Sequence, residues 1–523
     1  MKNNNGFVAR VSLIVALGGF LMGFDASVIS GVIRFIEPEF GLSKLQLGWA
    51  VSCLTLTSTL AMIVSGPLSD KFGRRIVLKY AAILYAISSL ASGLAPTFGL
   101  LIAARMMAGL GVGASLIVAP MYIAEISPAK IRGRMVSFNQ LNIVIGISAA
   151  FFTNYLILQL AKSDSPFALA VNFAEYNWRW MLGIETIPAI LYFIFLFFVP
   201  SSPRWLAMNG QEEKAMQILS KAGSKEDAAQ IIKSMKESNK VAGEKQKTPI
   251  RELFKPALKL VLLIGIGIAI LQQITGINAV FFYAPMIFEQ TGIGTDAAFS
   301  QAIFVGLTNL VFTIIAMWLI DKIGRKMLLI IGFSGILISM VVLASSFAMA
   351  TYTINDLNIS ALTSMIPDAN WSSIQGIVYN SDTEFRAAIE SLIGVESAKA
   401  NLSSIVNQSI HINSWMVLLG IIGFVASFAV SVGPVMWVLF SELFPNSVRG
   451  LAISFAGFVN SAVSFTVQLV FPWELQNLGN TGTFLIYGAF GLIGLIFVLL
   501  VLPETKGKSL EELEKILVKS NNN

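Results

Sequence analysis

Charged residues are scarce in this sequence. Asp, Glu, Lys and Arg make up 13% of its 523 residues, whereas hydrophobic residues make up 55%. A soluble globular domain carries about 25% charged residues. Here the few charges also gather between long apolar runs, which is typical of a chain that crosses a membrane many times. The net charge of +6 does not indicate nucleic-acid binding, because the basic residues concentrate in the loops between these runs.

Cysteine and histidine are almost absent as well. The single Cys53 excludes a disulfide framework and a multi-cysteine metal site, and the single His411 excludes histidine-rich metal chemistry. Gly507-Lys-Ser509 is the only fragment similar to a phosphate-binding loop, and Leu502 stands where that motif requires glycine. No nucleophile and base stand out together. We therefore expect no metal, no cofactor and no enzyme activity.

Long apolar runs dominate what is present. A bilayer core about 30 Å thick requires about 20 apolar helical residues, and twelve runs meet that length. They lie at 8–32, 46–69, 76–95, 98–122, 135–160, 180–200, 258–288, 298–320, 327–350, 413–440, 450–472 and 481–502. One glycine-rich stretch in the fourth run, Gly109–Gly113, predicts close helix packing rather than a dinucleotide loop. The sequence thus predicts an all-α membrane protein with twelve spans.

Lysine and arginine predict the orientation of these spans. Both residues concentrate in the loops after spans 2, 4 and 8 and in the linker 201–257, whereas the alternate loops are poor in them. Loops of this kind stay on the cytoplasmic side, so both termini and the linker are expected there. The predicted domains are a six-helix bundle over 1–200, a linker of short amphipathic helices over 201–257, and a second six-helix bundle over 258–523.

An internal repeat supports two related halves. Asp70-Lys-Phe-Gly-Arg-Arg75 reappears as Asp321-Lys-Ile-Gly-Arg-Lys326, and Ala124–Gly133 corresponds to Ser441–Gly450. Paired membrane halves are a common design of alternating-access transporters. The second pair of motifs is further apart than the first. The extra residues fall in the polar stretch 351–412, which predicts a long outer loop.

The repeated motifs also suggest a gate. Their charged residues lie at helix ends that are expected to face the cytoplasm, where salt bridges among them could close that face. The alternative is that Lys and Arg only fix the orientation of the spans. The candidate gate residues are Asp70, Arg74, Glu125, Arg132, Asp321, Arg325, Glu442 and Arg449.

Three ionisable residues lie within the predicted spans of the first half. Asp25 is in the middle of span 1, where a carboxylate costs roughly 2.5–3.5 kcal/mol or more and normally faces a partner or a cavity. Arg105 in span 4 is the expected counter-charge, and Glu185 lies just inside span 6. Desolvation favours the neutral carboxyl, so this set predicts a proton site. A purely structural ion pair is the alternative.

Amide side chains mark a second candidate site. Span 7 carries Gln272, Gln273 and Asn278; on a straight helix Gln273 and Asn278 would point about 140° apart. Gly276 between them permits a break, and broken helices line transporter binding sites. Amides donate and accept hydrogen bonds, which matches the hydroxyls of a neutral polyol. Further candidates are Gln140, Asn309, Trp437 and Asn460. Taken singly, each amide could instead be an interhelical contact worth about 0.6 kcal/mol.

The combined motifs resemble those of the sugar porters of the major facilitator superfamily over nearly the whole chain. The matching segments are Gly66-Pro-Leu-Ser-Asp-Lys-Phe-Gly-Arg-Arg75, Arg105–Gly113, Tyr122–Gly133, Pro200-Ser-Ser-Pro-Arg-Trp-Leu206, Gln272–Asn278, Asp321–Arg325 and Pro503-Glu-Thr-Lys-Gly507. The resemblance implies the major facilitator fold, with two pseudo-symmetric six-helix bundles and a central sugar site. It assigns the sugar site to Gln140, Gln272, Gln273, Asn278, Asn309, Trp437 and Asn460, and the proton pair to Asp25 and Arg105, with Glu185 at the position of the acid of the bacterial xylose–proton symporters.

The resemblance implies a proton-coupled monosaccharide symporter. A facilitative uniporter and a non-transporting sugar sensor are the alternatives, and a drug–proton antiporter is possible by fold alone. The expected partners are a sugar, a proton and the lipid bilayer, with a monomer in a bacterial inner membrane. Ser201, Phe282 and Ser461 depart from the common pattern of the family, in which Glu, Tyr and Trp occur. The last two departures leave the identity of the sugar open.

Overall fold

The structure is a computed structural model that describes most of the chain. It describes residues 5–128, 131–222, 228–232, 250–445, 448–506, 508 and 512–513. The side chains of residues 5, 250, 321, 399, 400, 402 and 403 also lie outside the description.

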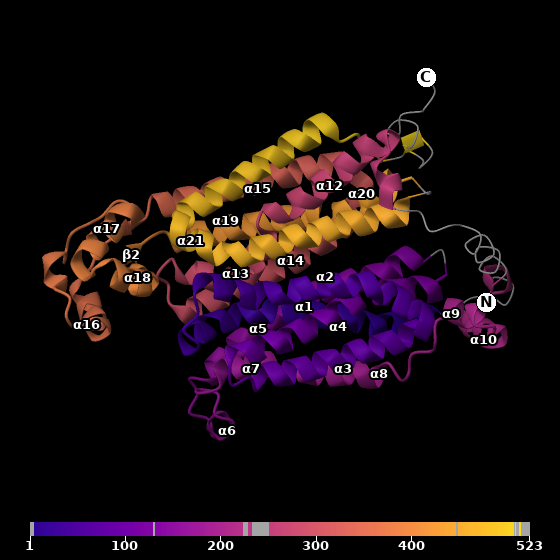
Figure 1. The fold of residues 1–523 in the computed structure, drawn as a ribbon, viewed down its shortest axis with the longest axis horizontal. Helices are drawn as coiled ribbons and strands as arrows, with labels where there is room; N and C mark the ends of the chain where they lie inside the picture. The colour runs from indigo at the N-terminus through magenta and orange to yellow at the C-terminus, as the bar shows by residue number, and fades with distance from the viewer. Residues whose placement is uncertain are drawn as a thin grey trace. The chain divides into compact units, whose positions relative to one another are not determined.

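Helices make up nearly all of the described structure (Figure 1). The first part of the chain forms α1 (Asn5–Glu39), α2 (Lys44–Phe72), α3 (Arg74–Gly93), α4 (Phe98–Ile126), α5 (Arg132–Leu160), α6 (Pro166–Ala170), α7 (Asn177–Gly183), α8 (Thr186–Phe195), α9 (Pro203–Met208) and α10 (Glu212–Ala222). The second part forms η1 (Ile250–Phe254), η2 (Pro256–Leu258), α12 (Lys259–Ile274), α13 (Ile277–Glu289), α14 (Thr295–Ile323), α15 (Arg325–Ala348), β1 (Thr351–Tyr352), α16 (Asp356–Met365), η3 (Trp371–Ser373), α17 (Asp382–Ile393), α18 (Val395–Ser409), β2 (Ile410–His411), α19 (Ser414–Ser427), η4 (Phe428–Val432), α20 (Gly433–Leu443) and α21 (Arg449–Val501).

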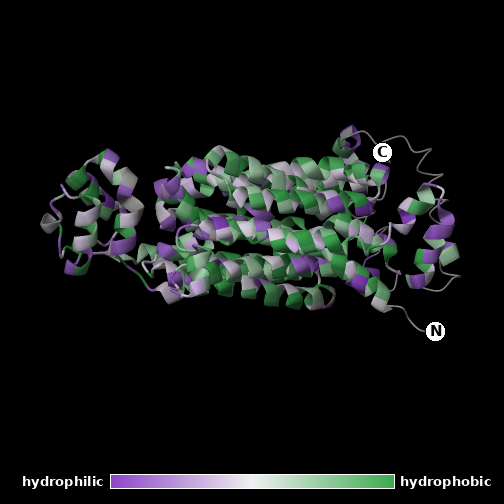
Figure 2. Cartoon of the chain, turned by 90° about the horizontal axis from the view of Figure 1, so that it is seen from below, coloured by the Kyte–Doolittle hydropathy of each residue, from purple (hydrophilic) through white to green (hydrophobic). Residues whose placement is uncertain are grey.

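The predicted all-α fold with twelve spans is confirmed. Some predicted spans consist of more than one helix, and one helix comprises two spans. Among the described residues, ten helices are long and apolar enough to cross a membrane. The last of them, α21, contains Gly479 with the non-helical dihedrals φ 68° and ψ 172°, so it comprises both predicted spans 11 and 12. Predicted span 6 contains part of α7, which ends at Gly183, and α8, which begins at Thr186; Ile184 and Glu185 between them keep right-handed helical dihedrals. Figure 2 shows apolar residues along the middle of these helices.

The described chain divides into two compact units. Unit 1 comprises residues 1–270, 437–469 and 507–523, and unit 2 comprises residues 271–436 and 470–506. This division does not follow the sequence halves, since α12, α20 and α21 each change unit along their length. The domain boundaries near residues 200 and 257 therefore stay a prediction.

Glycines allow the helices of unit 1 to approach one another closely. A Cβ added to Gly23 of α1 would lie 2.0 Å from the carbonyl oxygen of Ile143 in α5, and one added to Gly146 would lie 2.1 Å from that of Phe20. The predicted packing role of the 109–113 stretch is confirmed, because a Cβ on Gly113 of α4 would lie 2.2 Å from the carbonyl oxygen of Ser58 in α2. Small residues have this function in membranes, where burying apolar surface between helices gains little.

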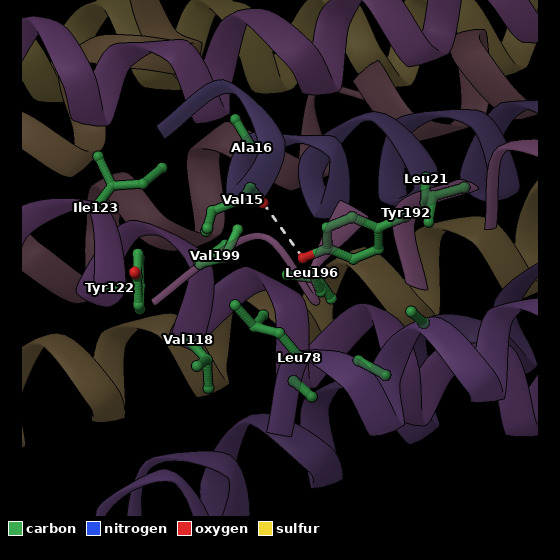
Figure 3. Packing of buried hydrophobic residues seen from close by; sticks show 14 of the residues in the cluster. Val15, Ala16, Leu21, Leu78, Val118, Tyr122, Ile123, Tyr192, Leu196 and Val199 are labelled. Carbon is green, nitrogen blue, oxygen red and sulfur yellow. Dashed lines mark hydrogen bonds between the residues drawn. The ribbon is translucent and has the colours of Figure 1, made fainter. Parts of the chain in front are cut away.

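Apolar side chains fill the space between these helices. In the cluster drawn in Figure 3, Val15 of α1, Leu78 of α3 and Val118 of α4 pack together with residues from the end of α8. The hydroxyl of Tyr192 donates to the carbonyl oxygen of Val15 at 3.3 Å, so its one polar atom is satisfied inside the cluster. This core fixes the helices that carry the ionisable residues described below.

Residues 351–412, predicted to be a long loop, form a folded subdomain instead. Strands β1 and β2 pair at its two ends, with Thr351 opposite His411. Helices α16, α17 and α18 surround a separate apolar core that includes Phe385 and Ile389. Figures 1 and 2 place these helices beyond the ends of α15 and α19. The stretch is polar on average, yet its apolar residues recur at helical spacing, and its position on the outer side stays a prediction.

Short helices in the predicted linker 201–257 are confirmed for the described part. Helices α9 and α10 and the segment 228–232 share a small core that includes Leu206, Leu219 and Ile232. Residues 223–227 and 233–249 of the linker lie outside the described residues.

Candidate functional site

The predicted contact between Asp25 and Arg105 is present in unit 1. A guanidinium nitrogen of Arg105 lies 3.5 Å from Oδ1 of Asp25, and both residues are at least nine-tenths buried. A second nitrogen of Arg105, Nε, donates to the backbone carbonyl of Ala50 at 2.9 Å. The backbone of α2 thus holds the arginine in place, so its position does not depend on the charge of Asp25.

The Asp25 carboxylate is poorly satisfied for a buried charge. Its Oδ2 has no hydrogen-bond partner among the described residues, and its contact with Arg105 is an ion pair without a hydrogen bond. Glu185 at the start of α8 is also buried, has an oxygen without a described partner, and interacts electrostatically with both Asp25 and Arg105. A buried charge without full pairing is unfavourable. The site therefore contains two buried acids, Asp25 and Glu185, and one arginine, Arg105, that a backbone hydrogen bond holds in place.

The expected break in span 7 is confirmed. Helix α12 ends at Ile274, Gly276 adopts the left-handed conformation with φ 91° and ψ 16°, and α13 starts at Ile277. This turn brings together two side chains that a straight helix would separate, because Nδ2 of Asn278 donates to Oε1 of Gln273 at 2.8 Å. Glycine is required at this position, since L side chains rarely adopt such a φ.

A short amide chain continues from this turn. Nε2 of Gln273 donates to Oε1 of Gln272 at 3.3 Å, and Nε2 of Gln272 lies 3.4 Å from the carbonyl oxygen of Val432 and 3.3 Å from that of Gly433. Those carbonyls lie at the end of the π-helical turn η4, where regular α-helical pairing is interrupted. The structure thus groups Gln272, Gln273 and Asn278 beside two interrupted helices in unit 2.

The other predicted sugar-site residues have varied surroundings. Asn460 in unit 1 donates to the backbone carbonyl of Ala269 at 2.9 Å, an interhelical contact. Trp437 is 46% exposed and contacts Phe440 edge to face, with 5.7 Å between ring centroids. Asn309 is buried in α14, and Gln140 is exposed on α5. The assignment of these residues to a sugar site stays a prediction.

In the first repeat, charged residues predicted to form a gate contact one another. The guanidinium of Arg74 lies 2.7 Å from Asp70 and 3.0 Å from Glu125, and it also donates to the backbone carbonyl of Ser69 at 3.1 Å. The other oxygen of Glu125 accepts a hydrogen bond from Ser202 at the start of α9. This network joins the ends of α2, α3, α4 and α9.

The second repeat reproduces the local turn of the first. Gly73 and Gly324 have φ values of 95° and 101°, and each arginine that follows donates to a backbone carbonyl five residues earlier, Ser69 for Arg74 and Ile320 for Arg325. Arg449 makes the same kind of contact, with the carbonyl of Phe444. The side chain of Asp321 lies outside the described residues. Glu442 is partly buried, and Arg132 is exposed with no ion pair described.

Glu504 belongs to the motif Pro503–Gly507, for which the sequence predicted no contact. Its carboxylate accepts hydrogen bonds from the backbone N–H groups of Arg325, Lys326, Thr505 and Lys506. Partial burial raises the pKa of this carboxyl, but the four N–H groups outweigh that effect and leave the pKa below its ordinary value. The signal in the sequence for this contact was weak: Glu504 is an acid just after a long apolar run, and a second helix starts at Arg325. Acids are favoured near helix N-termini.

Replacing Glu125 with Gln is expected to lower thermal stability. Arg74 is almost fully buried, and removing one partner of a buried pair costs about 3–5 kcal/mol; the remaining contacts of Arg74 with Asp70 and Ser69 place Glu125→Gln near the lower end of that range. A thermal-unfolding assay in detergent measures this. The exposed Arg132→Ala serves as the control. Equal unfolding temperatures for Glu125→Gln and Arg132→Ala would contradict the importance of the network.

Comparisons with known proteins cover almost the entire chain. The family described as "Sugar (and other) transporter" matches residues 11–366 and 397–517. The arabinose–proton symporter of Bacillus subtilis is 34% identical over 518 residues, which cover 99% of this chain and 97% of the relative. The D-xylose–proton symporter of Escherichia coli is 33% identical, with coverage of 98% and 96%.

Solved structures agree with these relatives. The inward-open structure of the xylose transporter XylE from Escherichia coli superposes with a TM-score of 0.73 at 32% identity, covering 98% of this chain and 100% of that chain. The partially occluded inward-open structure of the same transporter gives a TM-score of 0.72. This multi-pass membrane protein therefore belongs to the sugar transporter family of the major facilitator superfamily.

Proposed function

We propose that this protein is a proton-coupled monosaccharide symporter that works by alternating access. The observation that carries the proposal is the buried Asp25–Arg105 ion pair, which lies beside the second buried acid Glu185. Two relatives that are similar over nearly the whole chain are named as proton symporters of arabinose and of xylose. A pentose or a hexose is the proposed substrate.

The geometry suggests how a proton could act. Protonation of Asp25 would remove its attraction to Arg105, while the bond from Arg105 to the Ala50 carbonyl would keep the arginine in place. Asp25 would then be released without movement of its partner. Neutral Asp25 would favour sugar binding and reorientation of the protein, and loss of the proton on the inner side would return it to the paired state.

Sugar recognition is assigned to the predicted amides. Gln272, Gln273 and Asn278 form a chain in which each amide can exchange a neighbour for a sugar hydroxyl. Gln140, Asn309, Trp437 and Asn460 complete the proposed set, with Trp437 supplying an aromatic face and an indole N–H. We place the protein as a monomer in the bacterial cell membrane with both termini in the cytoplasm. The Asp70–Arg74–Glu125 network would then form part of a cytoplasmic gate, together with the other residues predicted for it.

Sugar uptake into proteoliposomes tests the proposal directly. The purified protein should accumulate arabinose, xylose or glucose when an inward proton gradient is imposed, and sugar addition should raise the external pH. Downhill equilibration of sugar without any pH change would instead indicate the facilitative uniporter. Sugar binding without any transport would indicate a sensor.

Replacing Gln273 with Ala is expected to raise the half-saturating sugar concentration about tenfold or more. The substitution removes one amide from the sugar and also the hydrogen bond that Asn278 donates to Gln273, and a lost hydrogen bond of this kind costs about 1–3 kcal/mol. Counterflow kinetics with radiolabelled sugar measure the effect. Asn477→Ala is the matched control, because Asn477 is an exposed amide whose side chain donates to the backbone carbonyl of Trp473 in its own helix. An equal effect of both variants would argue against a sugar contact.

A further inference from the structure

The α16–α18 subdomain, residues 351–412, contains a stretch that the family match leaves out. The family match ends at residue 366 and resumes at residue 397, so it omits 367–396. This stretch forms η3 and α17 and contributes Trp371, Phe385 and Ile389 to the subdomain core. It is therefore an addition that is folded into a small domain, and it requires an explanation beyond the function of the family.

The core fixes the orientation of α17. Phe385 is fully buried and stacks on Tyr352 of β1, with 5.2 Å between ring centroids and 13° between ring planes. Ile389 lies one turn further along on the same buried face. Because β1 follows α15 and pairs with β2, α17 is tied to the base of the subdomain. The adjacent face of α17 presents Asp382 and Arg386.

These two residues contact the break in α21. Arg386 donates from Nε to Oδ2 of Asp382 at 2.7 Å, and from Nη1 to the backbone carbonyl of Gln476 at 2.8 Å. The same Asp382 oxygen lies 3.1 Å from the place that a Cβ on Gly479 would occupy. Gly479 has φ 68° and ψ 172°, a conformation essentially limited to glycine. One ion pair thus lies against the chain at Gln476, three residues before the bend between spans 11 and 12, and at Gly479, the bend itself.

A helix that ends at a break has carbonyl oxygens without intrahelical partners. Arg386 supplies a charged donor to one of them, and hydrogen bonds to charged groups are stronger than neutral ones. Asp382 in turn holds the guanidinium in position. All four residues belong to unit 2, so the contact lies within one compact body.

We propose that Asp382 and Arg386 form a strap that fixes the bend of α21 at Gly479 and thereby positions spans 11 and 12 for transport. The role in transport rests on the proposed function, whereas the fixing of the bend does not. Arg386 is a positioning residue in this proposal, and it does not contact the sugar or the proton site.

Hydrogen–deuterium exchange of the full-length protein in nanodiscs tests the strap. In Arg386→Ala, amides of the peptide covering 476–483 are expected to exchange about tenfold faster than in the parent, because the charged hydrogen bond is lost. Asp382→Asn should give a smaller increase, because Arg386 keeps its bond to Gln476. The control Glu384→Gln removes a neighbouring exposed acid of α17 and should leave the rates unchanged. Unchanged exchange in Arg386→Ala would overturn the strap.

If Arg386→Ala unfolds the subdomain, amides around Phe385 will also exchange faster. A second variant tests the strap in that event. Arg386→Lys keeps the charge but lacks the forked donors. It should give an intermediate exchange rate at 476–483 with α17 still protected, and a rate equal to that of the parent would overturn the proposal.

Counterflow kinetics separate the strap from the sugar site. Arg386→Ala should lower the maximal rate about threefold or more and leave the half-saturating sugar concentration unchanged, because no proposed sugar contact is altered. An unchanged maximal rate would overturn the role in transport. If the parent protein moved no sugar at all, the proposed function would fail, and the exchange experiment would still decide whether the strap exists.

Discussion

Asp25→Asn is expected to abolish uphill sugar accumulation while leaving sugar exchange intact. A proton that crosses a membrane potential of 100 mV releases about 2.3 kcal/mol, enough to hold a neutral sugar about fiftyfold more concentrated inside. Asparagine cannot take up or release that proton. The accumulation ratio in proteoliposomes should therefore fall to about 1, and sugar-induced alkalinisation should disappear.

Exchange should survive because asparagine has the shape of the protonated acid. The guanidinium of Arg105 keeps its hydrogen bond to the Ala50 carbonyl, and the second acid Glu185 remains within electrostatic reach. Removing one partner of a buried ion pair nevertheless lowers stability. Thermal unfolding should accordingly be measured beside transport, so that a loss of folded protein is not mistaken for uncoupling.

Two results, with Glu213→Gln as the control, distinguish a proton-coupling role of Asp25 from a structural role and from a role in the sugar pathway. Glu213→Gln removes an exposed acid in α10 and should accumulate sugar like the parent. Unchanged accumulation in Asp25→Asn would sink the proton-coupling hypothesis and make Asp25 a structural residue. Loss of counterflow together with accumulation, in a protein that unfolds at the normal temperature, would indicate that Asp25 contacts the sugar pathway itself.

Gly146→Ala is expected to lower the stability of the protein strongly. Its Cβ would lie 2.1 Å from the carbonyl oxygen of Phe20 and 3.0 Å from the backbone nitrogen of Phe24, so α1 and α5 would have to separate. Overpacking costs about 1–3 kcal/mol even where side chains can move, and these neighbours are backbone atoms. We expect the unfolding temperature to fall by about 5 °C or more.

Gly133→Ala is the matched control in the same helix. It lies in the first turn of α5, nothing lies within 4 Å of its added Cβ, and alanine forms helices better than glycine by about 1 kcal/mol. Its unfolding temperature should equal or exceed that of the parent. A similar loss in both variants would show that the close approach of α1 and α5 does not govern the result.

Several local features could be predicted because each depends on a few neighbouring residues. The break at Gly276 follows from a glycine between amides in an apolar run, and the structure adds the Gln273–Asn278 bond that results. The repeated Asp-Lys-x-Gly-Arg motif predicted two related halves, and the structure adds that Gly73 and Gly324 have nearly the same φ. Charge scarcity and run length were sufficient for the membrane fold.

Other features depend on contacts between distant residues and could not be predicted. The polar composition of 351–412 concealed a folded subdomain, because its core forms only when Phe385, Tyr352 and Ile405 come together from three elements.

The sequence by itself determined the class of the molecule: a twelve-span, all-α chain with an internal repeat, acids within the first half and amides in span 7. Hydropathy, charge and glycine placement act locally, so they can be read without a structure. Only the tertiary structure decided which groups meet. It placed Arg105 against both Asp25 and the Ala50 carbonyl, Glu504 on the backbone of Arg325, and Arg386 on the bend at Gly479. Hydrogen bonds and ion pairs act over a few ångströms, so their partners follow from the packing of distant segments and not from residue order.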